Sequence, residues 1–271
     1  MLKHPGVRAG LTIVLMMANA SSQAGFLQVE HIVQCMQENV VVSGAFRPLT
    51  ATTRRPDGGE RKTGIHLYWR MLDSGDMGLN LQVVSPPDLA GIAYLLRPSD
   101  QAVKAWLYLP AMDSVREISA DQLTEALWGT EFSYAQFRQL LGVMLTGEAH
   151  RLADEEQAGR EVYVIDAQPG RKGGGHLAVR SYIDKQSCLL LRAEYFGPDG
   201  ELHQVLQGDP ATLVGTRVAS REVWQMSTYT MRNLKSGQET RLEAGDIRLL
   251  DGESSSLFSP AHFHERIGPG Q

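Results

Sequence analysis

The chain has 271 residues, 42% of them hydrophobic, with 26 basic and 31 acidic side chains and a formal net charge of −5. Nucleic-acid-binding proteins are typically basic, so this balance argues against a nucleic-acid partner and against general attraction to anionic lipid surfaces. The length allows one large domain or two small ones with a substantial core.

The first 24 residues have the pattern of a secretory signal peptide. Lys3 and Arg8 give a positively charged start, and a short apolar run covers residues 10–18. Small residues at 18–20 (Ala-Asn-Ala) and at 22–24 (Ser-Gln-Ala) offer two cleavage sites. The apolar run is shorter than the roughly 20 residues that a membrane-spanning helix needs. The pattern therefore predicts export, with the periplasm as the compartment in a bacterial cell.

Cleavage is expected before Ser21 or Gly25, which leaves a signal peptide, residues 1–24, and a single domain, residues 25–271. The signal peptide carries two basic residues and no acidic one, so its removal changes the net charge from −5 to −7. The first cysteine is Cys35, well beyond the apolar run, so a lipid-modified N-terminus is not expected.

The remaining chain begins with a predicted helix and continues as strands. Apolar residues at helical spacing predict an amphipathic helix over residues 26–39. The segment 48–62, rich in Thr, Arg, Pro and Gly, predicts a mobile loop or hairpin tip. Alternating apolar and polar residues predict strands over 65–71 and 77–83 and a hairpin over 91–110. Further strand patterns, separated by turn residues, cover residues 149–155, 160–167, 176–184, 188–196, 201–207, 213–233 and 239–249.

Helix patterns are few. Short helices are predicted over residues 121–127 and 133–141, with a turn or two near the C-terminus. No repeat of 20 to 50 residues and no linker divides the chain. The sequence therefore predicts a mainly β fold with short helices, as a barrel or a curved antiparallel sheet.

The chain has no motif that indicates catalysis or a bound cofactor. It lacks a Gly-x-Ser-x-Gly elbow and a phosphate-binding glycine loop, and the glycine-rich segment 170–175 is best explained as a hairpin tip. His262 and His264 offer two imidazoles without a third metal ligand, and the acidic run 154–156 fits a solvated turn. We therefore expect no catalytic residue, no metal and no cofactor. Cys35 and Cys188 can pair in an oxidising compartment, but the sequence leaves their pairing open.

A longer pattern between residues 105 and 137 connects the chain to a known family. A strand, a Leu-Pro break, a Val-Arg-x-Ile strand and a Gly-Thr-Glu-Phe-Ser-Tyr element follow one another. This order resembles the LolA-like outer-membrane lipoprotein-sorting family, and the C-terminal segment 226–263 resembles that family's ending. One departure is Thr130-Glu131, where Ser-Asp is more usual. The matching residues are Trp106, Tyr108, Pro110, Val115, Arg116, Ile118, Gly129, Thr130, Glu131, Phe132, Ser133 and Tyr134.

The resemblance implies a curved antiparallel incomplete β-barrel with a helical lid over an apolar cavity. Such a cavity suits a carrier of acyl chains, because each CH₂ exposed to water costs about 0.8 kcal/mol. We expect Thr130 to act as a helix N-cap, with Ser133 or Glu131 supporting the first turn. The candidate cavity residues are Leu67, Trp69, Leu79, Leu81, Tyr94, Leu96, Trp106 and Tyr108.

Each candidate cavity residue also fits ordinary core packing. If Leu79 and Leu81 form a cavity wall, their truncation to alanine should cost about 1 kcal/mol or less, against about 2 to 5 kcal/mol in a filled core. The leading hypothesis is a periplasmic carrier or chaperone for lipoproteins or lipids, with an inner-membrane transporter and an outer-membrane acceptor as partners. An envelope-stress sensor or regulatory binding module on the same fold is the alternative, and a hydrolase of unrecognised type is a weaker third.

Overall fold

The computed structural model describes residues 29–40, 44–99, 102–119, 122–123, 125–142, 148–168, 178–218, 221–250 and 254–265. The predicted signal peptide, residues 1–24, and the glycine-rich segment 170–175 lie outside the described residues. Within the described part, none of the helices combines the length and the apolar character needed to cross a membrane.

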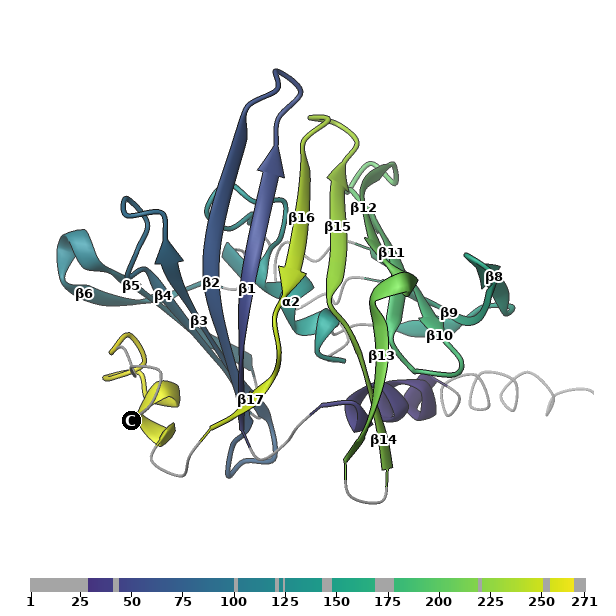
Figure 1. Ribbon diagram of the computed structural model, residues 1–271, viewed down its shortest axis with the longest axis horizontal. Coiled ribbons are helices and arrows are strands. Elements are labelled where there is room, and N and C mark those ends of the chain that lie inside the picture. Colours follow the sequence, from purple (N-terminus) through teal and green to yellow (C-terminus); the bar gives the residue numbers. More distant parts are fainter. Residues whose placement is uncertain are drawn as a thin grey trace, which may run out of the picture.

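One large antiparallel sheet dominates the fold (Figure 1). Its strands follow the order β6-β5-β4-β3-β2-β1-β16-β15-β12-β11-β10-β9-β7, with β17 beside β1 and β8 beside β9. The first group of strands is β1 Ala45–Arg54, β2 Glu60–Met71, β3 Met77–Ser85, β4 Ala93–Ser99, β5 Ala102–Leu109 and β6 Ser114–Ile118. The second group is β7 Ala149–Arg151, β8 Glu155–Gln157, β9 Arg160–Ala167, β10 Ala178–Asp184, β11 Leu190–Phe196, β12 Leu202–Gly208, β15 Thr228–Asn233, β16 Glu239–Ala244 and β17 Arg248–Leu249.

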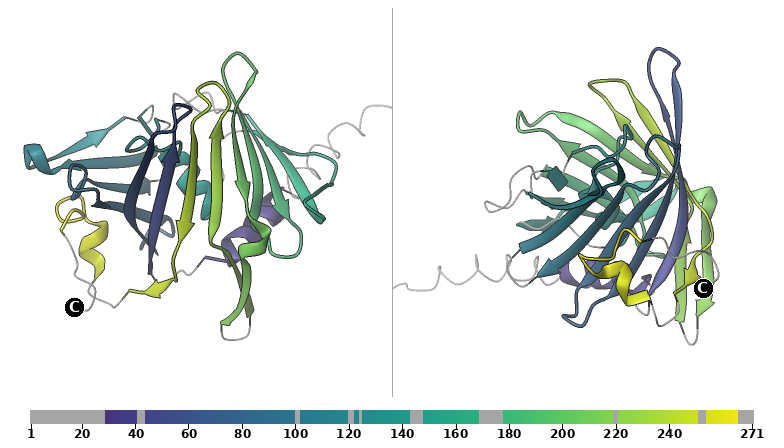
Figure 2. Two further views of the ribbon diagram at one scale, coloured as in Figure 1. Left: turned by 45° about the horizontal axis from the view of Figure 1, so that its top comes forward. Right: turned by 90° about the vertical axis from the view of Figure 1, so that its left-hand side faces the viewer.

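The sheet curves strongly but does not close into a barrel (Figure 2). In the strand order, β6 and β7 stand at opposite ends and are not paired with each other. The predicted fold class, a curved and incomplete antiparallel barrel with short helices, is confirmed. The two groups of strands meet where β1 pairs with β16, with Leu49 opposite Ala244.

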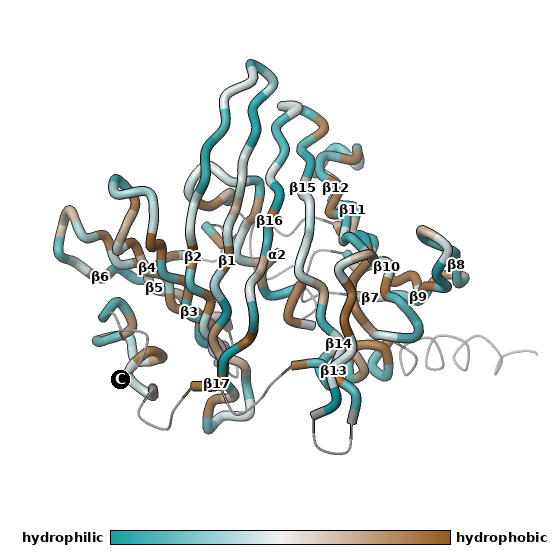
Figure 3. Tube along the Cα trace, viewed as in Figure 1, coloured by the Kyte–Doolittle hydropathy of each residue, from teal (hydrophilic) through white to brown (hydrophobic). Residues whose placement is uncertain are grey.

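The segment predicted as a loop or hairpin tip is mostly strand. Residues 48–54 belong to β1 and residues 60–62 to β2, so only residues 55–59 form the tip. The prediction of a mobile segment over 48–62 is therefore wrong in extent. The many Thr and Arg residues suit a long hairpin whose far end is hydrophilic, as the teal and white tube in Figure 3 shows.

Two helices lie on the concave side of the sheet. The described part of the N-terminal helix, residues 29–38, confirms the predicted amphipathic helix there, with Val29, Ile32 and Met36 buried. Helix α2, Tyr134–Leu140, confirms the second short helix. The predicted helix over 121–127 is wrong: residues 122–123 form only a 3₁₀ turn, and Ala126 makes a β-bridge with Ser133.

The strand pattern over 213–233 contains three strands. β13, Leu213–Val218, and β14, Arg221–Met226, form a separate two-stranded sheet before β15 returns to the large one. Further short 3₁₀ helices are η1 Pro110–Met112, η3 Pro210–Thr212 and η4 Ser254–Phe258.

The convex side of the first group of strands is covered by the C-terminal segment, residues 254–265 (Figure 2). Its Leu257, Phe258 and Phe263 are buried against a second apolar cluster that includes Tyr68 and Leu95. The main core lies on the concave side. Strands β4 and β5 are therefore apolar on both faces because each face has its own cover.

Candidate functional site

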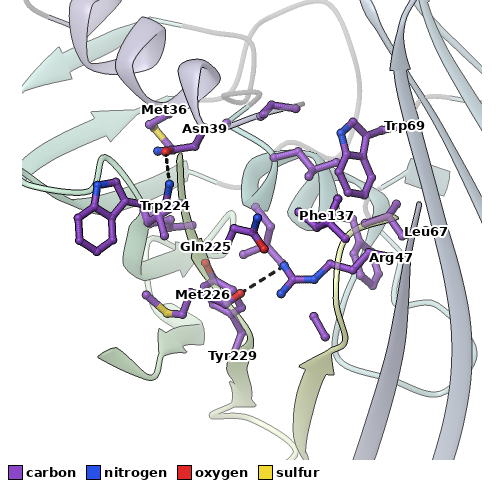
Figure 4. A pocket seen from close by; sticks show the side chains of 18 of the residues that line it. Met36, Asn39, Arg47, Leu67, Trp69, Phe137, Trp224, Gln225, Met226 and Tyr229 are labelled. Atoms are coloured by element: carbon purple, nitrogen blue, oxygen red, sulfur yellow. Dashed lines mark hydrogen bonds between the residues drawn. The ribbon is translucent and has the colours of Figure 1, made fainter. Parts of the chain in front are cut away.

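A pocket opens on the concave side of the sheet, between its central strands and the elements that cover them (Figure 4). The space inside it that is accessible to water-sized molecules is about 90 Å³. Side chains from the sheet include Leu49, Leu67, Trp69, Leu190, Tyr229 and Leu242, and the covers add Met36, Val40, Phe137, Leu140, Trp224 and Met226. The wall is therefore mainly apolar.

The pocket is small for a ligand site in its present form. Pockets that bury drug-sized ligands typically enclose about 300 to 1,000 Å³. A long acyl chain fits only if the covering elements move apart.

Arg47 places a guanidinium in this apolar wall. It follows the inward-facing Ala45 on β1 and lies opposite Leu67 on β2. Its Nε donates to the Gly245 carbonyl at 2.6 Å, and its Nη1 is 3.4 Å from the Met226 carbonyl. Burial lowers the pKa of Arg47 from its usual value. The nearby Tyr229 hydroxyl is also buried, which raises its pKa.

The N-terminal helix forms one cover of the pocket and is held by three links. A disulfide joins Cys35 to Cys188, with the two Cα atoms 5.7 Å apart. The Asn39 side chain donates to the Ser187 carbonyl at 2.6 Å. The same amide accepts from the Trp224 backbone N–H at 2.8 Å, which ties the helix to β14. These links leave the helix attached at its C-terminal end.

Helix α2 forms the second cover and spans the hollow of the sheet through polar side chains. Gln139 donates to the Ser181 hydroxyl on β10 and accepts from the Tyr195 hydroxyl on β11. Gln136 donates to Gln204 on β12. These partners are buried or half-buried, so water competes little for the hydrogen bonds that fix the position of the helix.

The prediction that Thr130 caps this helix is wrong. Ser133 is the N-cap: its hydroxyl accepts from the Gln136 N–H, and the Gln136 side chain accepts in return from the Ser133 N–H. The Thr130 hydroxyl instead donates to the Leu127 carbonyl at 2.7 Å inside the preceding turn. A single hydroxyl three residues before the cap is easily mistaken for it in a sequence.

Glu131 anchors the same turn to the large sheet. Its carboxylate accepts from the side-chain amides of Gln204, Asn233 and Gln238 at 2.8 to 3.0 Å. Its backbone N–H donates to the Thr240 hydroxyl. The Gly-Thr-Glu-Phe-Ser-Tyr element therefore positions the helical lid on β12, β15 and β16.

Six of the eight candidate cavity residues share the concave face. The strand register places Leu67, Leu81 and Tyr94 in one row and Trp69, Leu79 and Leu96 in the next. Leu67 and Trp69 line the pocket. The other four do not: Leu79, Leu81 and Leu96 are at most 1% exposed in the main core, and Tyr94 packs against Trp128 and Tyr134.

Trp106 and Tyr108 lie on the opposite face of the sheet, so the structure corrects their assignment to the cavity. They pair with Leu95 and Ala93, whose side chains belong to the convex cluster. Tyr108 stacks on His264 of the C-terminal segment, with ring centroids 4.0 Å apart. Both faces of β5 are apolar, so its alternation could not show which face carries the cavity.

Some of the histidine and acidic side chains that were considered as possible sites in the sequence contact charged neighbours. His262 contacts Glu265, and Asp154 of the acidic run pairs with Arg151 and Lys185. Asp199, Glu201 and His203 form a cluster near the β11–β12 turn that sequence spacing did not reveal. Lys235 and His203 already contact the Asp199 carboxylate, and their hydrogen bonds hold its pKa well below the usual range.

Two parts of the pocket were missed from the sequence. The strand pattern over 213–233 hid the hairpin that brings Trp224 and Met226 to the wall. Arg47 lay between the predicted helix over 26–39 and the predicted loop over 48–62, although Ala45, Arg47 and Leu49 alternate with outward residues. An arginine at an inward position of a strand was the available signal.

Several solved structures share the fold of this protein. A domain from Vibrio parahaemolyticus described as an outer membrane lipoprotein-sorting protein domain has a TM-score of 0.74 at 20% identity, over 90% of this chain and 100% of that chain. A DUF1329 family protein from Desulfovibrio piger has a TM-score of 0.74 at 19% identity, over 88% and 97%. A LolA superfamily protein from Nitrosomonas europaea has a TM-score of 0.64 at 16% identity, over 85% and 96%.

The chain therefore has a LolA-like fold, which confirms the resemblance found in the sequence at the level of the fold. A family model described as "Uncharacterized protein" matches residues 80–265, and the chain belongs to that family. No curated protein matches the sequence.

Proposed function

We propose that this protein is a periplasmic carrier that shields the acyl chains of lipoproteins or lipids in its pocket during transfer toward the outer membrane. The observation that carries the proposal is the apolar pocket on the concave side, covered by the N-terminal helix, α2 and the β13–β14 hairpin. The LolA-like fold supports the same class of function, and the signal-peptide pattern supports the compartment.

The energetics suit transport without chemistry. Moving an acyl chain through water costs about 0.8 kcal/mol of free energy for each exposed CH₂ group. A wall of leucine and aromatic side chains removes that cost by burying the chain. The small volume of the pocket means that cargo enters by displacing the covers. Part of the binding energy is then spent on opening, which keeps the cargo releasable to the next protein.

The carrier needs a donor and an acceptor. An inner-membrane transporter would load it and an outer-membrane protein would receive its cargo. The proposal assigns the chain no catalytic residue and no cofactor.

The test is recovery of cargo from the protein in its own compartment. Protein purified from the periplasm is expected to carry lipid or acylated peptide in native mass spectrometry. Ala244→Phe fills the pocket from β16 and is expected to abolish both this cargo and the uptake of a fluorescent fatty acid. Ala211→Phe, at an exposed position of η3, is the matched control and should bind like the wild type.

The same experiment can refute the carrier. A wild-type protein that carries no lipid and takes up no fatty acid, or an Ala244→Phe variant that binds both normally, would contradict it. Recovery of a stable protein partner in place of lipid would support the regulatory alternative.

A further inference from the structure

Among the described residues, the mainly apolar wall of the pocket contains one arginine, Arg47. Arg47 occupies an inward position of β1, in the row that continues across the sheet as Leu67, Leu81 and Tyr94. Every other member of that stretch is apolar or aromatic. Figure 4 shows the Arg47 side chain reaching into the pocket between Phe137 and Met226.

Arg47 lacks an acidic partner inside the pocket. Among the residues that the structure describes, no carboxylate lies within ion-pair distance of it, and Asp246, which acts on it electrostatically, is exposed. Its contacts are the carbonyls of Gly245 and Met226. A guanidinium has five N–H donors, so these two bonds leave donors free for a ligand.

A second donor lies beside Arg47. Tyr229 lines the same pocket from β15, and within the described part of the chain no side chain or carbonyl accepts a hydrogen bond from its hydroxyl. The two groups interact electrostatically. The Asn39 amide, which also lines the pocket, is already bonded to Ser187 and Trp224. The polar groups available to an incoming ligand are therefore Arg47 and Tyr229, with the uncharged Gln225 amide beside them (Figure 4).

We propose that the pocket selects acyl amphiphiles with an anionic headgroup, a carboxylate or a phosphate, and that Arg47 with Tyr229 binds this headgroup while the apolar wall takes the chain. A guanidinium matches both anions in a two-donor geometry, and it binds them most strongly where water is excluded. The inference rests on the proposed carrier function and adds the class of cargo to it.

Direct binding of three probes with the same C16 chain tests the headgroup. Palmitate, hexadecyl phosphate and 1-hexadecanol are titrated below their aggregation limits by displacement of a fluorescent fatty acid. The wild type is expected to bind the two anions about tenfold or more tighter than the alcohol. Inorganic phosphate alone is expected to compete at least about a hundredfold less well than hexadecyl phosphate, because it leaves the apolar wall empty.

Substitutions then assign the preference to Arg47. Arg47→Gln is expected to bind all three amphiphiles with similar affinity, because the alcohol does not use the cation. Arg47→Lys keeps the charge and is expected to retain part of the preference. Arg54→Gln removes an exposed arginine from the outward side of the same strand and is the control, expected to match the wild type.

Equal wild-type affinity for the anions and the alcohol would overturn the headgroup inference and leave the carrier standing. An unchanged anion preference in Arg47→Gln would do the same. Phosphate that competes as well as hexadecyl phosphate would show a site for free anions and would also overturn it. If none of the three amphiphiles binds, the carrier function fails as well. Should Arg47→Gln not fold, the wild-type preference and the Arg47→Lys variant still decide.

Discussion

The two faces of strands β2 to β5 are both covered, but by different segments of the chain. The concave face lies under helices and leads into the pocket, whose covers are tied by a disulfide and by single polar side chains. The convex face lies under the C-terminal segment, which Asn80 and Gln82 hold by hydrogen bonds to the carbonyls of Leu257 and Phe263. Apolar strands therefore indicate that a cover exists, but they do not show which face carries the pocket.

Removal of the disulfide is expected to give the largest loss of stability, and to loosen only the cover of the concave face. It links residues 153 apart in the sequence, so its removal in Cys35→Ala with Cys188→Ala should lower the unfolding free energy by about 4 kcal/mol. Denaturant melts of the wild type and the double variant measure this. Proteolysis of the C-terminal segment should stay at the wild-type rate before the melt, and a reducing agent should leave the double variant unaffected. Equal melts would show that the link adds no stability.

Truncation of leucines on the concave face should separate those in the packed core from those that line the pocket, by the stability that each truncation costs. Leu81 is fully buried away from the pocket, so Leu81→Ala should cost about 3 kcal/mol. Leu67 lines the pocket, so Leu67→Ala should cost about 1 kcal/mol and weaken fatty-acid uptake more than Leu81→Ala does, at matched fractions folded. This reverses the sequence expectation for Leu81. Similar stability losses at both positions would mean that the pocket wall is packed like the core.

The stability that comes from the loop holding the N-terminal helix, residues 184–188, should depend on acid. Burial alone raises the pKa of Asp184, but hydrogen bonds from Arg160 and Ser187 outweigh it and leave the pKa below its usual value of 3.8. Because the pKa of Asp184 is lower in the folded than in the unfolded protein, its carboxylate stabilises the folded state above pH 3.8. This contribution is lost as the pH falls through the pKa of the folded state. Asp184→Asn should therefore lower the unfolding free energy by about 2 kcal/mol at pH 7. The unfolding free energy of the variant should also fall less steeply than that of the wild type as the pH is lowered.

The control for the acid test is Asp73→Asn, at an exposed position in the β2–β3 turn. It should keep the wild-type dependence of unfolding free energy on pH between 2 and 5. An Asp184→Asn variant that still loses stability like the wild type in that range would assign the acid sensitivity to other groups.

Loss of an amide on the convex face should have a small effect on stability and none on the pocket. Asn80→Ala removes two buried hydrogen bonds to the C-terminal segment and should cost about 1 to 2 kcal/mol. The segment should become easier to cleave by limited proteolysis, while fatty-acid uptake stays at the wild-type level. Reduced uptake in this variant would mean that the two faces are coupled.

Local patterns predicted most of the strands, because alternation survives wherever one face is polar. The strand over 160–167 was placed at its observed bounds, and the amphipathic helix over 26–39 matches its described residues. The failures came from segments whose structure depends on distant partners. Residues 48–54 become strand by pairing with β16, and residues 221–226 pair with β13 outside the large sheet.

The site was harder to predict than the fold. Periodicity shows that Trp69 and Trp106 face an apolar environment, but the assignment of each to the concave or the convex side comes from register and curvature. The disulfide needed a distance that spacing does not contain, and Arg47 needed the knowledge that its strand is central. The pocket is made by contacts between segments far apart in the chain, which a single sequence does not encode in any local pattern.

The pairing of β1 with β16 at the middle of the sheet has a consequence for folding. Thr53 and Thr240, which share a hydrogen bond there, are 187 residues apart. The first group of strands can form from neighbouring hairpins, but the seam that joins the two groups must wait until nearly the whole chain has been made. Closing so long a loop is slow, so we expect the seam to form late. Until then the inward sides of both halves stay exposed, and the unfinished chain is the state most in need of protection from aggregation.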